Sequence, residues 1–471
     1  MTLQHAIQTY HNLLTTNVAA ESQGELEAQQ QRRGLFFGER PLCTVLRPRF
    51  LTPGQYRFIQ RRTRTLLRAF DKIHQAGIAN KTFRAQFDLT DWEEELVQHD
   101  PGFRPAIPIS RLDAFFSPSS PPSGRGVEGE GRSSSLTPNG QGALYFTEYN
   151  AETPAASAYN DVLTDVFYAL PVMQRFLRRY QVFPLPARHG VLHALLAVFR
   201  QWRGTSEAPR IAILDWGEVP TYSEFVLFES YFKSQGLECI IADPREVEYR
   251  QGGLYAGDFH ITLIYKRVLI SELIEHGGLD HPVVRAVREG AVCMVNPFAC
   301  KMLYKKASLA VLSDERNAHL FNREESQAIS DHIPWTRRVE ERHTEHGGQT
   351  IDLIPFIHQQ RERLVLKPND DYGGRGIVLG WTVDDAAWAE AVQIALTTPY
   401  IVQERVPIPS EPYPSLADGQ LHIFDRMLDT APFVFHSDSV YGCLTRLSTA
   451  ALLNVTAGGG STVPTFLVTR R

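Results

Sequence analysis

The sequence predicts an α/β fold, and three features support this class. A strand–helix–strand pattern lies between residues 210 and 242, a glycine-rich hairpin lies between Leu364 and Trp381, and helices with an apolar face separate other predicted strands. The chain has 471 residues, which is more than one hydrophobic core usually organises. Two or three structural units that share an interface are therefore expected.

The composition excludes several classes of protein. A hydrophobic content of 43%, a charged content of 21% and a net charge of -5 are typical of a soluble globular protein and lack the basic excess of a nucleic-acid binder. No apolar run has membrane-spanning length, and the N-terminus lacks the features of a secretion signal. A cytoplasmic location is therefore expected, with neither a membrane nor a nucleic-acid partner. The five cysteines are scattered and never spaced as CxxC, which predicts neither disulfides nor a zinc site.

The first 45 residues are predicted to form a polar helical leader. The Gln-rich run from Glu25 to Gln31 favours a solvated helix or a loose segment. A packed helix is predicted to begin at Pro53, after Thr52, with apolar residues at helical spacing as far as Phe70. Its arginines are interpreted as a solvated outer face.

Two predicted strands, 108–116 and 143–150, each carry a polar pair. Because side chains alternate along a strand, Arg111 and Asp113 share one side of the first, and Glu148 and Asn150 share one side of the second. Oxygen atoms that face one point suit Mg²⁺, which prefers octahedral oxygen coordination. The alternative is that both pairs face water at the edge of a sheet. The intervening residues 117–142 are so poor in apolar side chains that a disordered insertion is predicted.

The middle of the chain is predicted to contain a parallel sheet. Helices are expected at 159–180 and 188–202, then the strand–helix–strand pattern at 210–214, 222–234 and 239–242, and further strands at 260–268 and 291–295. Asp215 follows the first of these strands, a position that commonly faces a ligand in such sheets. The glycine fingerprint of a dinucleotide site is missing, which argues against NAD.

A helix with three lysines near its start, Lys301, Lys305 and Lys306, is predicted after Asn296. Cations oppose the helix dipole at an N-terminus, so a bound anion would relieve the repulsion. The alternative is that these lysines are solvated. The polar segment 338–348 is interpreted as an exposed loop.

The glycine-rich hairpin is predicted to contain a strand that ends at Lys367, a tight reversal at 373–376 and a returning strand at 377–379. Glycines such as Gly373 and Gly374 let backbone N–H groups approach phosphate oxygens, and Lys367 adds a positive charge. The P-loop pattern is absent, and a plain hairpin with a surface lysine is the alternative. A helix at 384–396, a strand at 399–407 and a second glycine-rich loop at 458–460 are expected to follow.

In this order, the motifs resemble those of the circularly permuted ATP-grasp ligases, the group that contains eukaryotic-type glutathione synthetase and glutathionylspermidine synthetase. The resemblance runs from about residue 47 to residue 468 and skips the 117–142 insertion. The matching segments are Arg111-Leu-Asp113, Glu148-Tyr-Asn150, Lys305-Lys306-Ala307, Lys367 to Gly374, Tyr400 to Glu404, Gly442 to Arg446 and Gly458 to Gly460. Any one match is weak, whereas several in the same order are specific. The chain departs from glutathione synthetases at Ser448, where they have a lysine.

The resemblance implies a permuted ATP-grasp fold with a Rossmann-like preATP-grasp subdomain for the substrate and a glycine-rich lid. The chain would then divide into the helical leader at 1–45, a first part of the ATP-grasp core at 46–205, the Rossmann-like subdomain at 206–298 and a nucleotide-binding part with the lid at 299–471.

The resemblance also implies site residues. By position, the magnesium ligands would be Asp113, Glu148, Asn150 and Asp371. The ATP phosphates would be held by Lys306, Lys367, Gly373 and Gly374, and adenine would be contacted by Val402, Gln403, Glu404 and Val406. Arg111 would hold the transferred phosphate, and Arg446 the substrate carboxylate.

The implied function is ATP-dependent ligation of a carboxylate and an amine, from small-molecule or peptide substrates, through an acyl phosphate. ATP and Mg²⁺ would be required. Two alternatives stay open: a nucleotide-binding pseudo-enzyme that serves as an interaction module, and a small-molecule kinase. The presence of Asp113, Glu148 and Asn150 together argues against the first, because a binding relic has no need of them.

Overall fold

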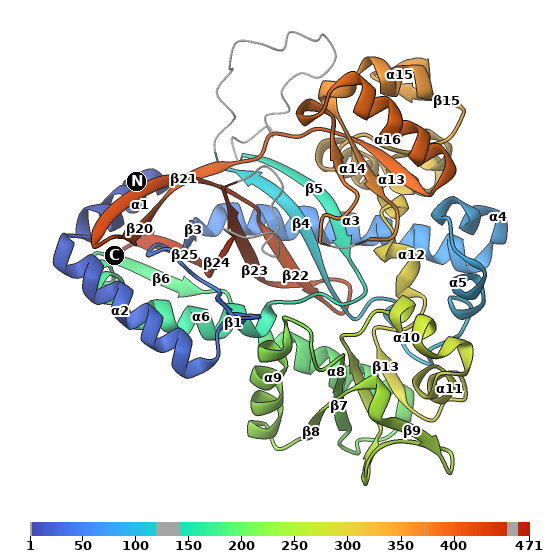
Figure 1. The fold of residues 1–471 in the computed structure, drawn as a ribbon, viewed down its shortest axis with the longest axis horizontal. Coiled ribbons are helices and arrows are strands. Elements are labelled where there is room, and N and C mark those ends of the chain that lie inside the picture. Colours follow the sequence, from blue (N-terminus) through green and yellow to red (C-terminus); the bar gives the residue numbers. More distant parts are fainter. Residues whose placement is uncertain (1, 119–141, 372, 450–459) are drawn as a thin grey trace.

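The computed structural model describes residues 2–118, 142–371, 373–449 and 460–471 as a mixed α/β fold (Figure 1). The predicted α/β class is therefore confirmed. The predicted disordered insertion falls mainly on residues 119–141, and the second glycine-rich loop falls mainly on 450–459, both outside the described residues. Among the helices that are described, none is long and apolar enough to cross a membrane.

A seven-stranded antiparallel sheet lies at the centre of the molecule. Its strands, in spatial order, are β20 (Ser410–Ala417), β21 (Gln420–Leu428), β23 (Ser439–Ser448), β22 (Ala431–Phe435), β4 (Ile109–Ser117) and β5 (Ala143–Asn150), with β24 (Ser461–Val463) also paired to β23. The sheet therefore joins two parts of the chain that are far apart in sequence, because β4 lies beside β22.

The long helix α3 (Pro53–Ala79) packs against this sheet and confirms the predicted helix. Thr52 and Gln55 form a capping box at its start, which satisfies N–H groups that the first turn leaves free. Near that end, the Tyr56 hydroxyl donates to the Gly442 carbonyl and Gln60 donates to the Val440 carbonyl. These bonds fix the helix against β23.

A four-stranded parallel sheet lies below the central sheet in the view of Figure 1. Its strands, in spatial order, are β13 (Cys293–Val295), β12 (Leu263–Lys266), β7 (Arg210–Leu214) and β8 (Glu238–Ala242), and it packs against α8 (Arg188–Arg203), α9 (Tyr222–Ser234) and α11 (Pro282–Arg288). The predicted strand–helix–strand pattern is confirmed. α10 (Ile270–Gly277) follows β12.

The single strand predicted at 260–268 is wrong, because the structure divides it. β11 (Phe259–Ile261) pairs with β10 (Gly253–Ala256) in a small antiparallel sheet that also holds β9 (Val247–Arg250). Thr262 marks the break: its hydroxyl accepts from the Arg210 N–H, and its own N–H donates to the Arg210 carbonyl. These bonds attach the chain to β7, and only β12 continues in the parallel sheet.

A second four-stranded sheet contains the predicted glycine-rich hairpin. It consists of β14 (Thr336–Arg338), β19 (Tyr400–Glu404), β17 (Leu364–Pro368) and β18 (Val378–Leu379). All of its pairs are antiparallel, as the hairpin prediction requires. α15 (Leu353–Gln359) and α16 (Asp385–Thr397) pack with it around the buried Trp388, whose indole N–H donates to the Ile357 carbonyl.

Three further predictions need correction. The helix expected after Asn296 is two short helices, α12 (Cys300–Tyr304) and α13 (Ala307–Ser313), because Lys305 leaves helical geometry with ψ 136°. The helix expected at 159–180 is α6 (Ser157–Ala169), α7 (Pro171–Phe176) and the start of β6 (Tyr180–Pro184), since Pro171 opens a new helix.

The loop expected at 338–348 contains β15 (His343–His346), which pairs with β16 (Gln349–Asp352). α14 (Arg323–His332) precedes this segment and packs on α3.

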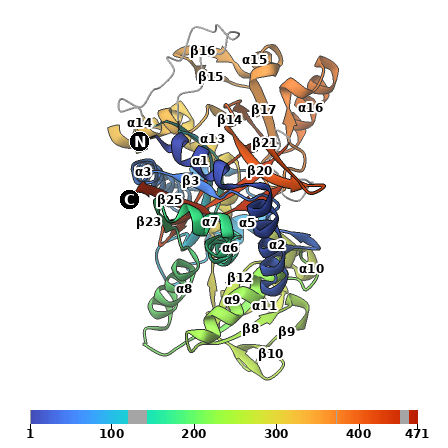
Figure 2. The ribbon, with the colours of Figure 1, turned by 90° about the vertical axis from the view of Figure 1, so that its left-hand side faces the viewer.

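The N-terminal segment is helical as predicted, but it is not a loose leader. α1 (Leu3–Leu13) and α2 (Thr16–Arg33) pack against α6 and α7 (Figure 2). Tyr10 and Leu26 are buried in a core that also includes residues of β20, β21 and β23. Close by, β3 (Arg49–Leu51), β25 (Thr465–Arg470) and β6 form a three-stranded sheet. Composition alone did not indicate that one side of α2 is packed, because most residues of this helix are polar.

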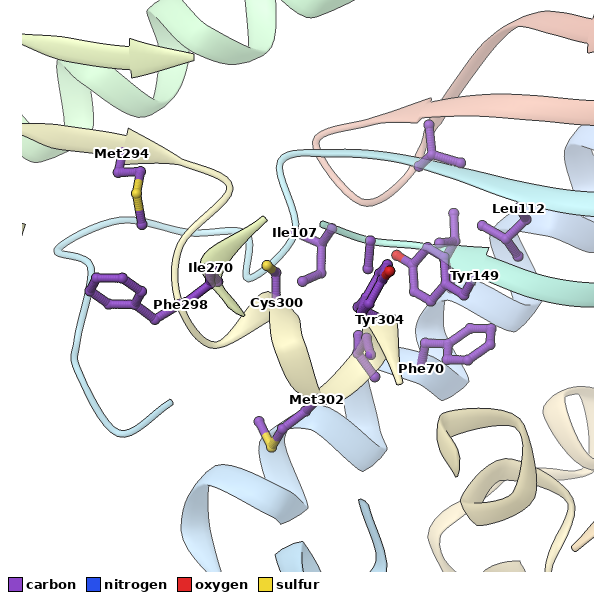
Figure 3. Close-up of a cluster of buried hydrophobic side chains, with 14 of the residues drawn as sticks. Phe70, Ile107, Leu112, Tyr149, Ile270, Met294, Phe298, Cys300, Met302 and Tyr304 are labelled. Carbon is purple, nitrogen blue, oxygen red and sulfur yellow. The ribbon is translucent and has the colours of Figure 1, made fainter. Parts of the chain in front are cut away.

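A buried cluster fixes the central sheet against the helices that carry the lysines. Phe70 of α3 packs on Tyr149 of β5, and Met302 and Tyr304 of α12 belong to the same core (Figure 3). This packing places the end of β5 next to the α12–α13 junction, where the candidate site lies.

Candidate functional site

Two pockets meet between the central sheet and the sheet of the glycine-rich hairpin. The first pocket contains about 960 Å³ and the second about 1450 Å³ of space, and in both cases this includes open solvent. The second pocket reaches the ends of the parallel strands. Asp113, Glu148, Gly373 and Arg446 line both pockets. Residues predicted from separate motifs therefore share one junction.

The β4–β5 ladder brings the two polar pairs together. Arg111 lies opposite Asn150, and Asp113 lies opposite Glu148, next to an irregularity in the register. Arg111, Asp113, Glu148 and Asn150 all line the second pocket. Strand alternation, which predicted this arrangement, therefore describes the structure correctly at both strands.

Asp113 is held by two arginines. Its Oδ1 accepts from Arg111 Nε at 2.7 Å, and its Oδ2 accepts from Arg111 Nη2 at 3.1 Å and from Arg446 Nη2 at 2.5 Å. Burial alone would raise the pKa of Asp113, but the two guanidinium groups outweigh it and hold the pKa well below its ordinary value. The carboxylate is therefore ionised, and both of its oxygens accept charged hydrogen bonds.

Lys367 lies at the floor of the first pocket. Its Nζ donates to Gln403 Oε1 at 2.7 Å and to the Thr147 carbonyl at 3.2 Å. Burial lowers the pKa of Lys367 to about 8, although Glu148 and Asp113 favour the charged form. Among the described residues, this desolvated cation makes no ion pair with a carboxylate, and an anion in the first pocket would stabilise its charge.

Of the three lysines in the 301–306 segment, Lys306 contacts a residue of the junction, although it is outside the described lining of both pockets. Its Nζ lies 3.4 Å from Glu148 Oε1 and donates to the Asp371 carbonyl at 2.5 Å. Lys301 and Lys305 instead lie on carboxylates of the protein itself, namely Asp370, Glu152 and Glu93. For these two lysines, neither the bound anion nor the alternative of solvated side chains describes the structure, because both are buried on carboxylates of the protein.

The far end of the first pocket is mostly apolar. Its lining includes Val365, Ile377, Leu379, Trp381, Val406 and Ile408. Gly373 and Gly374 form part of the wall, with φ angles of 68° and 77° that an L side chain rarely adopts. Apolar side chains in one part of a pocket and glycines with a lysine in another suit a nucleotide, whose base is apolar and whose phosphates are charged.

Only some of the residues predicted to contact adenine, on and after β19, line the first pocket. Gln403, Glu404 and Val406 line the first pocket. The prediction for the Val402 side chain is wrong, because this residue pairs with Leu366 and points into the core around Trp388. Glu404 is further positioned by His346, whose Nε2 lies 3.1 Å from Glu404 Oε1.

The oxygen atoms at the junction have the chemistry that Mg²⁺ prefers, but they are few. In the described part of the chain, no group of three or more His, Cys, Asp or Glu side chains could hold a metal ion by itself. Glu148 lies at the junction, and the Asn150 amide nitrogen is buried with no hydrogen-bond partner among the described residues. Asp371 is outside the described lining of both pockets. These donors fit Mg²⁺ only if phosphates and water supply the other ligands, as is usual in phosphoryl-transfer sites.

The second pocket extends to polar groups at the parallel sheet. Asp215, predicted from its place at the end of β7, lies there together with Arg267 and Glu272. Burial raises the pKa of Asp215 to about 6 against the opposing effect of Arg267. Charges of both signs around a large cavity suit a substrate that itself carries polar or charged groups.

Asp429 is the site residue that sequence reasoning missed. It lines the first pocket and accepts from Arg446 Nε at 2.6 Å and from the Arg446 backbone N–H at 2.7 Å. It follows β21 directly after Leu428, with apolar residues nearby on both sides and Asp425 four positions earlier, so no motif distinguishes it. Only the pairing of β21 and β22 with β23 brings it to Arg446.

Comparison with known proteins gives a match in structure but not in sequence. No family model and no curated protein matches the chain. Among solved structures, a glutathione synthetase-like effector from Globodera pallida, in its apo form, matches with a TM-score of 0.59 over 97% of this chain and 99% of that chain, at 11% sequence identity. At this identity the match shows the fold alone. The chain therefore has the overall fold of a glutathione synthetase-like protein.

Proposed function

We propose that the protein is an ATP-dependent carboxylate–amine ligase with a circularly permuted ATP-grasp fold. The observation that carries this proposal is the junction of the two pockets at Asp113, Glu148, Gly373 and Arg446. A nucleotide in the first pocket and a carboxylate in the second would bring the reacting groups to the same place. Positioning of this kind is the main requirement of phosphoryl transfer.

The first pocket has the parts that ATP requires. Lys367 supplies a desolvated positive charge, and Gly373 and Gly374 let the backbone approach phosphate oxygens. Trp381 and the neighbouring aliphatic side chains offer apolar surface to a base. ATP is therefore the proposed nucleotide, with its phosphates toward Glu148.

Glu148 and Asn150 would hold Mg²⁺, and Asp113 would join them after one of its arginine contacts is exchanged. When bound, Mg²⁺ neutralises charge on the phosphates. Arg111 and Arg446 add positive charge at the junction, where they would bind the transferred phosphoryl group and the substrate carboxylate. Preorganised charges stabilise the transition state without reorganisation during the reaction.

The reaction follows from this arrangement. A carboxylate oxygen attacks the γ-phosphorus of ATP, the bond to the bridging oxygen breaks, and ADP leaves with that electron pair. The acyl phosphate then reacts with an amine nitrogen, which releases phosphate and a proton and forms an amide. The charged and polar groups of both signs that line the second pocket suit a peptide or another polar substrate.

The proposal is tested by measuring ADP release from ATP and Mg²⁺ with a panel of small and peptide carboxylates, each with and without amines. We expect ADP formation that requires both substrates, and a product with the mass of an amide. A phosphorylated carboxylate or alcohol as the final product would instead indicate a kinase. A folded protein that binds Mg-ATP but forms no ADP with any pair would indicate a nucleotide-binding module.

Glu148→Gln tests the metal site. We expect the affinity for Mg-ATP to fall roughly 10- to 100-fold, because the variant loses a charged oxygen ligand at the junction. Isothermal titration with and without Mg²⁺ measures this change. The matched control is Glu345→Gln on the exposed side of β15, which should bind like the original protein. Unchanged affinity in Glu148→Gln would remove Glu148 from the metal site.

A further inference from the structure

Arg446 is shared between two carboxylates, and the two contacts are not equal. Its Nη2 lies 2.5 Å from Asp113 Oδ2 and 2.5 Å from Asp429 Oδ2. Asp429 makes two more bonds to the same residue, to Nε at 2.6 Å and to the backbone N–H at 2.7 Å. Asp429 therefore holds Arg446 more completely than Asp113 does.

The position of Asp429 is fixed by the backbone as well. Its N–H donates to the Arg446 carbonyl at 3.1 Å, so the two residues hold each other in both directions. The Asp429 side chain is buried, with 3% exposed. A carboxylate anchored in this way cannot turn toward another partner without the loss of several bonds.

Asp113 has the opposite character. Both of its oxygens accept from arginine, yet it is the carboxylate that lies opposite Glu148 and faces both pockets. To bind Mg²⁺, it must release at least one arginine. If Arg446 had no other partner, this release would leave a half-buried guanidinium, 23% exposed, without a carboxylate partner, which is unfavourable.

Asp429 removes that penalty. Arg111, Asp113, Arg446 and Asp429 carry two positive and two negative charges, so Arg446 and Asp429 form a neutral pair when Asp113 turns away. Arg446 would then keep its place at the junction through its two other bonds to Asp429. Sharing of this kind needs no movement of the arginine.

We propose that Asp429 is a positioning residue that retains Arg446 when Asp113 is released to bind Mg²⁺. This inference rests on the proposed function, because it assumes a Mg-nucleotide at the junction. It assigns to Asp429 two effects: it makes metal binding by Asp113 less costly, and it keeps Arg446 directed at the substrate.

The test uses Asp429→Asn in the full chain, which keeps the shape and an oxygen acceptor but removes the charge. Binding of a non-hydrolysable ATP analogue is measured by isothermal titration at increasing Mg²⁺ concentrations. We expect affinity without Mg²⁺ to be unchanged and the Mg²⁺ concentration needed for half of the maximal effect to rise about tenfold, because Arg446 then depends on Asp113. An equal loss of affinity at every Mg²⁺ concentration would show a merely structural role and overturn the inference.

A second background keeps the test decisive if Asp429→Asn lowers stability. The Arg446→Met variant lacks the guanidinium that Asp429 holds. Adding Asp429→Asn to this variant should therefore change the Mg²⁺ concentration needed for half of the maximal effect by less than about twofold. A shift as large as in the original background would contradict the inference.

If the original protein binds the analogue without any Mg²⁺ effect, the proposed function fails first and the inference fails with it. If that protein responds to Mg²⁺ but Asp429→Asn responds identically, only the inference fails.

Discussion

Lys367→Met is expected to reduce ATP turnover about 10²- to 10³-fold, the size of effect known for removing one preorganised hydrogen-bond donor from an active site. Lys367 is the desolvated cation that lines the first pocket, and among the described residues its Nζ donates to the Gln403 amide oxygen and the Thr147 carbonyl. Methionine has a similar length and cannot bind phosphate. ADP release, measured with the substrates that support turnover, gives the result directly.

The same change should not destabilise the fold. Burial lowers the pKa of Lys367 to about 8, below its ordinary value of 10.5, so the charged lysine disfavours the native state at pH 7. The melting temperature of Lys367→Met is therefore expected to equal or exceed that of the original protein at pH 7. The difference should shrink as the pH rises from about 8 to 10.5, where the native lysine is already neutral. A large loss of stability would show that Lys367 has a structural role.

Nucleotide affinity should also depend on pH through this lysine. Below about pH 8 the free site already carries the proton, and above it the proton must be taken up before phosphate can bind. We expect affinity to fall as the pH rises above 8, with proton uptake that appears as different binding enthalpies in two buffers. The exposed Lys81→Met is the control and should keep this behaviour, whereas Lys367→Met should lose it.

Glu152→Gln is expected to destabilise the fold by about 3–5 kcal/mol, the usual cost of removing one partner from a buried ion pair. Glu152 follows β5 and is fully buried. Its carboxylate accepts from the Ile270 N–H at 2.6 Å and lies 3.5 Å from Lys266 Nζ and 3.4 Å from Lys301 Nζ. Without the carboxylate, Lys266 loses its carboxylate partner while it remains buried in the interior.

Urea unfolding at pH 7 measures this effect. Burial alone would raise the pKa of Glu152, but Lys301 and Lys266 lower it below 4.5, so its contribution is present above that pH and is lost as the pH falls further. The exposed Glu246→Gln should change little. Glu152→Gln combined with Lys266→Met should recover part of the loss, since no unpaired charge is left at Lys266. Equal stability of Glu152→Gln and the original protein would contradict the account of this buried network.

Local patterns predicted the parts of the site that local rules govern. The alternation of side chains along a strand placed Arg111 beside Asp113, and the same rule, applied at β19, would have directed Val402 into the core and Gln403 into the pocket. The family resemblance instead implies that the Val402 side chain faces the pocket, whereas this side chain faces the core. The hairpin at Lys367 was recognisable because glycines with positive φ must occupy its reversal.

Long-range pairing explains what could not be predicted. Lys301 and Lys305 look free in the sequence, because Glu93, Glu152 and Asp370 come from distant segments. Asp429 likewise acquires its partner only when β21 and β22 join β23. Sequence periodicity describes the surroundings of a residue within one element, whereas these contacts depend on which elements meet.

The pairing of β4 with β22 also determines when the junction of the two pockets can form during translation. Asp113 and Arg446 are 333 positions apart, yet they share a direct ion pair. A ribosome that has released β4 and β5 has therefore delivered an acidic half-site whose basic partner has not yet been synthesised. The junction therefore cannot assemble in a nascent chain until Arg446 has left the exit tunnel.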